Sequence, residues 1–147
     1  MLRIMGWRDM TAEEAATLPE ARLGGALLWM VAAALLLCVV AIIGAALAPH
    51  QLREIGGRYA LAVGFVALWS LAFAILTLLR IRSTPLMASI GLVAWIAYRL
   101  SVAVLSHAGW PLAIDLLAEA ALAAGFCGYM AGGVRPNAYY RRRLPMS

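Results

Sequence analysis

Four long apolar stretches alternate with short polar segments along the 147 residues of the chain. They cover residues 23–47, 59–79, 85–105 and 110–133. Each has close to the length of about 20 residues that a helix needs to cross a hydrocarbon core. Because a helix satisfies its own backbone hydrogen bonds where no water is available, each stretch is expected to be a transmembrane helix. The pattern therefore predicts an all-α, polytopic membrane protein with a four-helix transmembrane domain over residues 23–133.

The connections between these stretches restrict how the helices are arranged. Pro49 ends the first stretch because proline cannot continue a helix, and Pro85 opens the third after the capping candidates Ser83 and Thr84. The connections at 80–84 and 106–109 are so short that the helices they join must be antiparallel neighbours. We therefore expect an antiparallel bundle, with room for a short surface helix in the longer connection at 48–58.

The composition supports a membrane environment and excludes several other classes. Hydrophobic residues make up 65% of the chain and charged residues 13%, whereas soluble domains average roughly 45–50% and roughly 25%. A small domain cannot hide so much apolar surface from water, and the same composition excludes a disordered tail or a disulfide scaffold. Every basic residue is Arg, and these residues form no stripe that could follow a phosphate backbone, so no nucleic-acid partner is expected.

The distribution of arginines predicts the orientation of the chain. Nine lie before the first stretch, between the second and third, or after the fourth: Arg3, Arg8, Arg22, Arg80, Arg82, Arg135, Arg141, Arg142 and Arg143. Only Arg53 and Arg58 lie in the opposite connections. Because arginine accumulates on the cytoplasmic side, both termini are expected in the cytoplasm.

A secretory signal peptide is the alternative for the first stretch. Ala46-Leu47-Ala48 resembles a cleavage site. However, four acidic residues lie in the leading segment, and the apolar run is longer than the usual 7–15 residues or so. The sequence therefore favours a retained helix.

The two terminal segments are expected to lie at the membrane surface. Within residues 1–22, Thr11 and Glu14 have the spacing of a capping box for a short helix that ends before Pro19, with disorder as the alternative. Residues 134–147 form a basic tail. Its central run is predicted to anchor the chain to anionic lipid head groups, with docking to an acidic partner surface as the alternative. The run consists of Tyr139, Tyr140, Arg141, Arg142 and Arg143.

Three ionisable residues inside the spans are the strongest candidates for a functional site. Asp115 and Glu119 are four residues apart and so share one face of the fourth span, while Arg99 lies near the end of the third. The short connection between these spans places all three groups at a similar depth, so we predict an intramembrane ion cluster. Tyr98 and His107 are possible hydrogen-bond partners. The cluster is interpreted either as an ion pair that fixes helix register or as a proton or cation site.

Small residues recur every four positions in the fourth span, at Ala120, Ala124, Gly128 and Gly132. Such a stripe lets another helix approach closely, either within the bundle or from a homo-oligomer or another membrane-protein partner. His50 and His107 are isolated, and no metal-binding or cofactor motif is present, so neither a metal nor a cofactor is expected.

From Leu23 onward the chain resembles an uncharacterised bacterial family of four-span inner-membrane proteins, a domain of unknown function. The similar features are Gly24-Gly25, the basic turn Arg80-Ile81-Arg82 before Pro85, and Tyr129 followed by Val134-Arg135 and Tyr139. Ala26 stands where a Trp often follows the double glycine, and Pro136-Asn137 interrupts the basic tail. The resemblance implies four spans and cytoplasmic termini, and no activity.

Two functions are consistent with these observations. The first is a membrane protein without enzymatic activity that acts by packing, as an accessory or scaffold subunit or by self-association. The second is an oligomeric small transporter or proton-coupled carrier that uses Asp115 and Glu119. An enzyme is disfavoured because the sequence offers no nucleophile with a base and no metal constellation.

Overall fold

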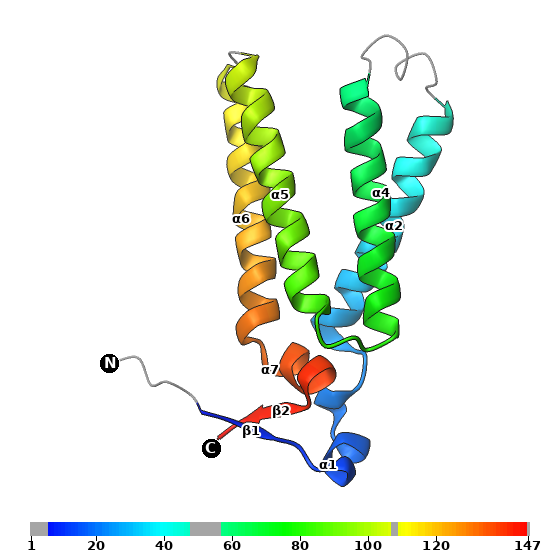
Figure 1. The fold of residues 1–147 in the computed structure, drawn as a ribbon, viewed down its shortest axis with the longest axis vertical. Helices are drawn as coiled ribbons and strands as arrows, with labels where there is room; N and C mark the ends of the chain where they lie inside the picture. Colours follow the sequence, from blue (N-terminus) through cyan, green and yellow to red (C-terminus); the bar gives the residue numbers. More distant parts are fainter. Residues whose placement is uncertain (1–5, 48–56, 107–108, 147) are drawn as a thin grey trace. The chain divides into compact units, whose positions relative to one another are not determined.

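Four long helices dominate the structure, a computed structural model that describes residues 6–47, 57–106 and 109–146 (Figure 1). They are α2 (Gly25–Leu47), α4 (Gly57–Leu78), α5 (Thr84–Leu105) and α6 (Trp110–Gly132). All four are long and apolar enough to cross a membrane. The predicted all-α class is therefore confirmed, and the four helices suggest a multi-pass membrane protein. The helix ends lie within two residues of the predicted ones.

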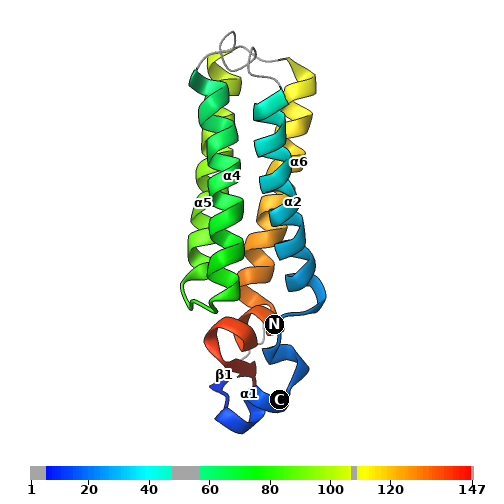
Figure 2. The ribbon, with the colours of Figure 1, turned by 90° about the vertical axis from the view of Figure 1, so that its right-hand side faces the viewer.

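Helices α2 and α4 form one compact unit over residues 23–81 and run side by side in both views (Figures 1 and 2). Their buried positions recur at intervals of three or four residues, which is the spacing of one helix face. In α2 these are Leu27, Val31, Ala34 and Cys38, and in α4 they are Ser70, Phe73, Ala74 and Thr77. Small side chains at Ala34, Ser70 and Ala74 permit close helix packing.

The second unit contains α5 and α6 together with both terminal segments. Before α2 the chain forms β1 (Trp7–Asp9), α1 (Ala12–Thr17) and the 3₁₀ turn η1 (Pro19–Ala21). After α6 it forms α7 (Val134–Pro136), the π-helical turn η2 (Asn137–Arg141) and β2 (Arg143–Pro145). We call these six elements the terminal cap, and they gather at one end of the α5–α6 hairpin (Figure 2).

The two ends of the chain are joined by a two-stranded antiparallel sheet in which Arg8 lies opposite Leu144. Two further backbone hydrogen bonds extend this pairing, from Met10 N–H to the Arg142 carbonyl and from Met146 N–H to the Gly6 carbonyl, both 2.8 Å. Residues 1–22 and 134–147 were predicted to be separate segments, without this sheet.

The short helix α1 has the capping box that was predicted from Thr11 and Glu14. The Thr11 hydroxyl accepts from the Glu14 backbone N–H at 3.2 Å, and the Glu14 carboxylate accepts from the Thr11 N–H at 3.0 Å. The helix ends at Thr17, before Pro19, as expected. Ser83 occupies the N-cap position of α5, but its side chain makes no capping hydrogen bond.

Candidate intramembrane ion site

Arg99 of α5 and Glu119 of α6 form a two-pronged ion pair between adjacent helices. Arg99 Nη2 donates to Glu119 Oε1 at 2.9 Å, and Arg99 Nε donates to Oε2 at 3.2 Å. The antiparallel turn between α5 and α6 brings the two residues to the same level. Because the two hydrogen bonds run side by side, they fix both the distance and the orientation of the guanidinium and the carboxylate.

Trp95 completes the site from one helical turn before Arg99. Its indole N–H donates to Glu119 Oε2 at 3.1 Å, and its ring lies 5.9 Å from that of Tyr98. The Glu119 carboxylate therefore accepts three hydrogen bonds, and both of its oxygens are used. Trp95 was not among the predicted site residues, although its position four residues before Arg99 places both on one face of α5.

Asp115 lies one helical turn from Glu119 on the flank of α6, and its side chain is exposed. Within the described ranges it makes neither a hydrogen bond nor an ion pair. The structure therefore brings together two of the three predicted cluster residues, and Asp115 stays beside that pair as a surplus acid. Tyr98 contributes a ring contact to Trp95, and His107 lies outside the described residues.

The ion pair is partly exposed at the surface of the α5–α6 hairpin. Arg99 has 27% of its side chain exposed and Glu119 has 34%. Asp115 precedes Glu119 by one turn of α6, and its side chain is exposed as well. Two acids and one guanidinium leave a formal surplus of one negative charge there, so the site has an unmatched carboxylate at the depth of the spans.

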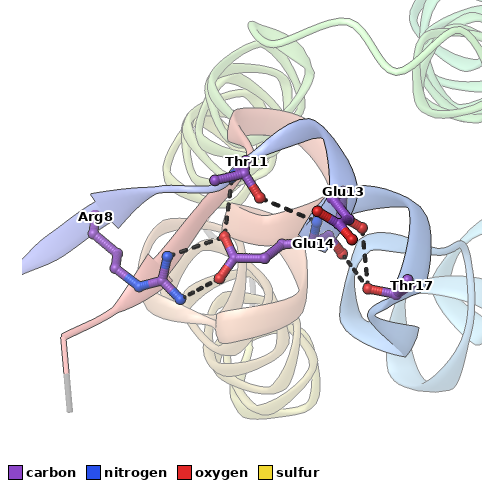
Figure 3. A network of polar contacts seen from close by, with 5 residues as sticks. All are labelled: Arg8, Thr11, Glu13, Glu14 and Thr17. Carbon is purple, nitrogen blue, oxygen red and sulfur yellow. Dashed lines mark hydrogen bonds and ion pairs between the residues drawn. The ribbon is translucent and has the colours of Figure 1, made fainter.

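A second polar network lies in the terminal cap and joins β1 to α1 (Figure 3). The Arg8 guanidinium donates to both Glu14 oxygens, at 3.0 Å and 2.6 Å, and the Thr17 hydroxyl donates to the Glu13 carbonyl at 3.0 Å. Hydrogen bonds from Arg8 and then from the Thr11 N–H lower the pKa of Glu14 from 4.5 to about 2. The same carboxylate raises the pKa of Arg8.

Tyr139 and Tyr140 lie inside the terminal cap, which corrects their predicted place among lipid head groups. Their exposed fractions are 5% and 2%, and their rings meet edge to face with centroids 5.0 Å apart. The sequence suggested lipid contact because the pair precedes a basic run. The turn of η2 instead directs both rings into the cap.

The terminal arginines are used largely as internal links. Arg143 pairs with Asp9 at 3.0 Å, and Arg141 donates to the Asn137 side chain at 2.9 Å. Arg135 donates to the carbonyls of Pro19 at 2.9 Å and Arg22 at 3.3 Å, and so joins the two ends of the chain. Arg142 is exposed.

The predicted stripe of small residues on α6 does not lie on one buried face. Ala120 is half-buried, whereas Ala124, Gly128 and Gly132 are exposed. A methyl group added at Gly128 or Gly132 would meet nothing within 4 Å. These glycines are therefore not used for close packing inside the described part of the chain.

No cluster of three or more His, Cys, Asp or Glu side chains suited to a metal ion occurs among the described residues. Comparisons with protein-family models, curated proteins and solved structures find no match to this chain. The resemblance noted from the sequence therefore adds nothing to the interpretation of the site, which depends on the geometry above.

Proposed function

We propose that the protein is a multi-pass membrane protein without enzymatic activity that acts through helix packing, as an accessory or scaffold subunit or by self-association. The observation that carries this proposal is the Glu119 carboxylate, whose two oxygens both accept hydrogen bonds from Arg99 or Trp95. A carboxylate held by three hydrogen bonds clamps α5 to α6. It thus favours the interpretation of the ion pair as a device that fixes helix register.

The surface of the α5–α6 hairpin supports the same proposal. In α6 only Met130 is buried, and in α5 the buried residues are confined to its first turns, at Thr84, Pro85 and Ala88. These helices therefore offer long apolar faces to lipid or to another membrane protein. We place both termini in the cytoplasm on the basis of the arginine distribution. The assignment to the bacterial inner membrane is based on the resemblance noted in the sequence analysis.

Purification in mild detergent, followed by native mass measurement and identification of co-eluting proteins, tests this function. We expect a defined oligomer or a stoichiometric partner. Glu119→Gln should weaken the α5–α6 clamp and lower thermal stability, while Glu20→Gln, in η1 outside the spans, serves as the control. A stable monomer with no bound partner, both in detergent and in lipid nanodiscs, would contradict the proposal.

An oligomeric transporter or proton-coupled carrier is the second candidate, and the surplus Asp115 carboxylate favours it. In proteoliposomes loaded with a pH-sensitive dye, such a carrier would show a proton flux that Asp115→Asn abolishes and Glu20→Gln leaves unchanged. Equal dye responses for the unmodified protein, Asp115→Asn and empty liposomes would remove this candidate.

A further inference from the structure

One face of α6 is exposed along the whole helix and has the spacing of a helix–helix interface. Its positions alternate at intervals of three and four residues, and every one of them is exposed. We call this face the α6 seam. It consists of Pro111, Ile114, Ala118, Ala121, Gly125, Gly128 and Gly132. The average spacing of 3.5 residues is that of two helices wound in a left-handed pair.

The side chains of the seam are small over its second half, where every position is Ala or Gly. Nothing lies within 4 Å of the place where a side chain would begin at Gly125, Gly128 or Gly132. Small residues at an interface let two backbones approach closely, and this gain in van der Waals contact drives helix association in lipid. The seam carries no charge that would oppose a second helix.

Two polar side chains lie on opposite flanks of the seam near the start of α6. Trp110 is 83% exposed and Asp115 is also exposed. In the described structure neither the Trp110 indole N–H nor the Asp115 carboxylate makes a hydrogen bond. A parallel helix pair brings residues five positions apart, on opposite flanks, next to each other across the interface. Trp110 and Asp115 have that separation, and one is a donor where the other is an acceptor.

This complementarity indicates a second copy of the chain. Copies inserted in a membrane share one orientation, so a two-fold axis along the membrane normal brings identical depths together. Each Asp115 then meets the Trp110 of the other copy, and the small half of the seam meets itself. A charged group that faces hydrocarbon without a partner is unfavourable, so a nearby donor for Asp115 is favourable.

We propose that two copies of the chain pack through the α6 seam, with the Trp110 indole of each copy donating a hydrogen bond to the Asp115 carboxylate of the other. The inference rests on the proposed function, in that it takes helix packing to be the mode of action and names the face and the partner. The Arg99–Glu119 pair, on the side of α6 toward α5, stays within each copy.

Disulfide cross-linking in native membranes tests the face. Single cysteines replace Ala118, Ala121 and Gly125 on the seam, in a chain that carries Cys38→Ser and Cys127→Ser. The controls place them at Ala120 and Ala123, on the side of α6 toward α5, and at Leu36, which is exposed on α2. The seam positions are expected to form covalent dimer at least about fivefold faster than the controls, because only they face the other copy.

The pattern of cross-linking separates the two proposals. Dimer formation fastest at Leu36 would overturn the seam and leave the self-associating function standing. Equal rates at seam and control positions in a protein that still purifies as an oligomer would do the same. A monomer at every position, with no partner protein bound, would overturn both.

A second measurement tests the hydrogen bond itself. Trp110→Phe keeps the ring and removes the N–H, and is expected to raise the dimer dissociation constant about three- to tenfold, as for other hydrogen bonds between membrane helices. In an Asp115→Leu chain the same substitution should have no further effect, because the acceptor is already gone. Equal effects of Trp110→Phe with and without Asp115 would overturn the pairing.

Discussion

Glu14 illustrates how a single exposed side chain organises the start of the chain. Its carboxylate accepts from Arg8 and from the Thr11 N–H, which lowers its pKa to about 2. Because this pKa lies below the ordinary value, the ionised group stabilises the terminal cap at neutral pH. That contribution shrinks as the pH falls below about 4.5 and is lost as it passes through the folded value near 2.

A carboxyl-carbon NMR titration of Glu14 checks this prediction. In the unmodified protein its midpoint is expected near 2. Arg8→Gln should raise the midpoint, because the largest cause of the shift is the hydrogen bond from Arg8. The Thr11 N–H remains in that variant, so the recovery should be partial. An unchanged midpoint in Arg8→Gln would show that the carboxylate is not held by this arginine.

Arg142 has a backbone conformation that is unfavourable for a residue with a side chain. Its φ of 53° and ψ of 47° lie in the left-handed region, at the point where η2 gives way to β2. Such a conformation costs a non-glycine residue roughly 1 kcal/mol. Arg142→Gly is therefore expected to stabilise the protein by about that amount relative to Arg142→Ala, in which the strain remains.

Thermal unfolding of the two Arg142 variants in detergent gives the comparison. Both lose the guanidinium, so the difference between them reports the backbone alone. If Arg142→Ala were as stable as Arg142→Gly, the left-handed turn would not be a source of strain.

At the scale of elements, the junction between α6 and α7 depends on Gly133. A methyl group there would lie 2.5 Å from the Tyr129 carbonyl oxygen and 3.0 Å from the Pro136 ring. Because the first contact is with backbone, the junction must shift, and Gly133→Ala is expected to destabilise the protein by about 1–3 kcal/mol. Asn137, which donates to the Gly133 carbonyl at 2.9 Å, would be displaced with it.

Gly64→Ala in α4 is the matched control for Gly133→Ala. Nothing lies within 4 Å of the added methyl group there, and alanine is the better helix former by about 1 kcal/mol. Its melting temperature should therefore be unchanged or higher. Similar losses for both substitutions would contradict the steric argument.

The clamp between α5 and α6 makes a double-substitution prediction. Arg99→Met or Glu119→Leu alone leaves one unpaired charge in the spans, which should cost about 2–3 kcal/mol. The double variant removes both charges and should lose less than the sum of the single variants. Thermal unfolding of the four proteins gives the coupling, and strictly additive losses would show that the pair does not join the helices.

The helices themselves were predictable because their lengths follow from the thickness of a bilayer. Apolar runs and bounding prolines placed the ends of α2, α4, α5 and α6 within two residues of the observed ones. The contact between Arg99 and Glu119 could also be anticipated, since a four-residue connection fixes the register of the two helices. The state of Asp115 could not, because charge and spacing do not reveal which of two acids a single guanidinium engages.

At the scale of the molecule, the terminal cap was the feature that the sequence concealed. Strands of three residues carry almost no periodic signal, and β1 and β2 lie at opposite ends of the chain. Only tertiary contact shows that Arg135 donates to carbonyls of the N-terminal segment, or that Arg143 pairs with Asp9. A basic tail in the sequence thus proves to be a fastening between the two ends.

The fastening bears on topology, because it requires both ends of the chain to lie on one side of the membrane. If each of the four candidate helices crosses the membrane, the chain returns to the side on which it began, and this requirement is met. The arginine distribution then predicts that Ser83, at the start of α5, faces the cytoplasm and that Ser106, at its end, faces the periplasm.

Single cysteines at these two serines, in a chain with Cys38→Ser and Cys127→Ser, report the orientation. A maleimide that cannot cross the membrane should label Ser106→Cys in intact cells, and should label Ser83→Cys only after the membrane is opened. Arg80→Gln combined with Arg82→Gln removes two of the charges that hold this side in place, and should increase labelling of Ser83→Cys in intact cells. Labelling of both serine positions in intact cells without that change would mean that α5 does not cross, and the shared side of the two termini would then need another explanation.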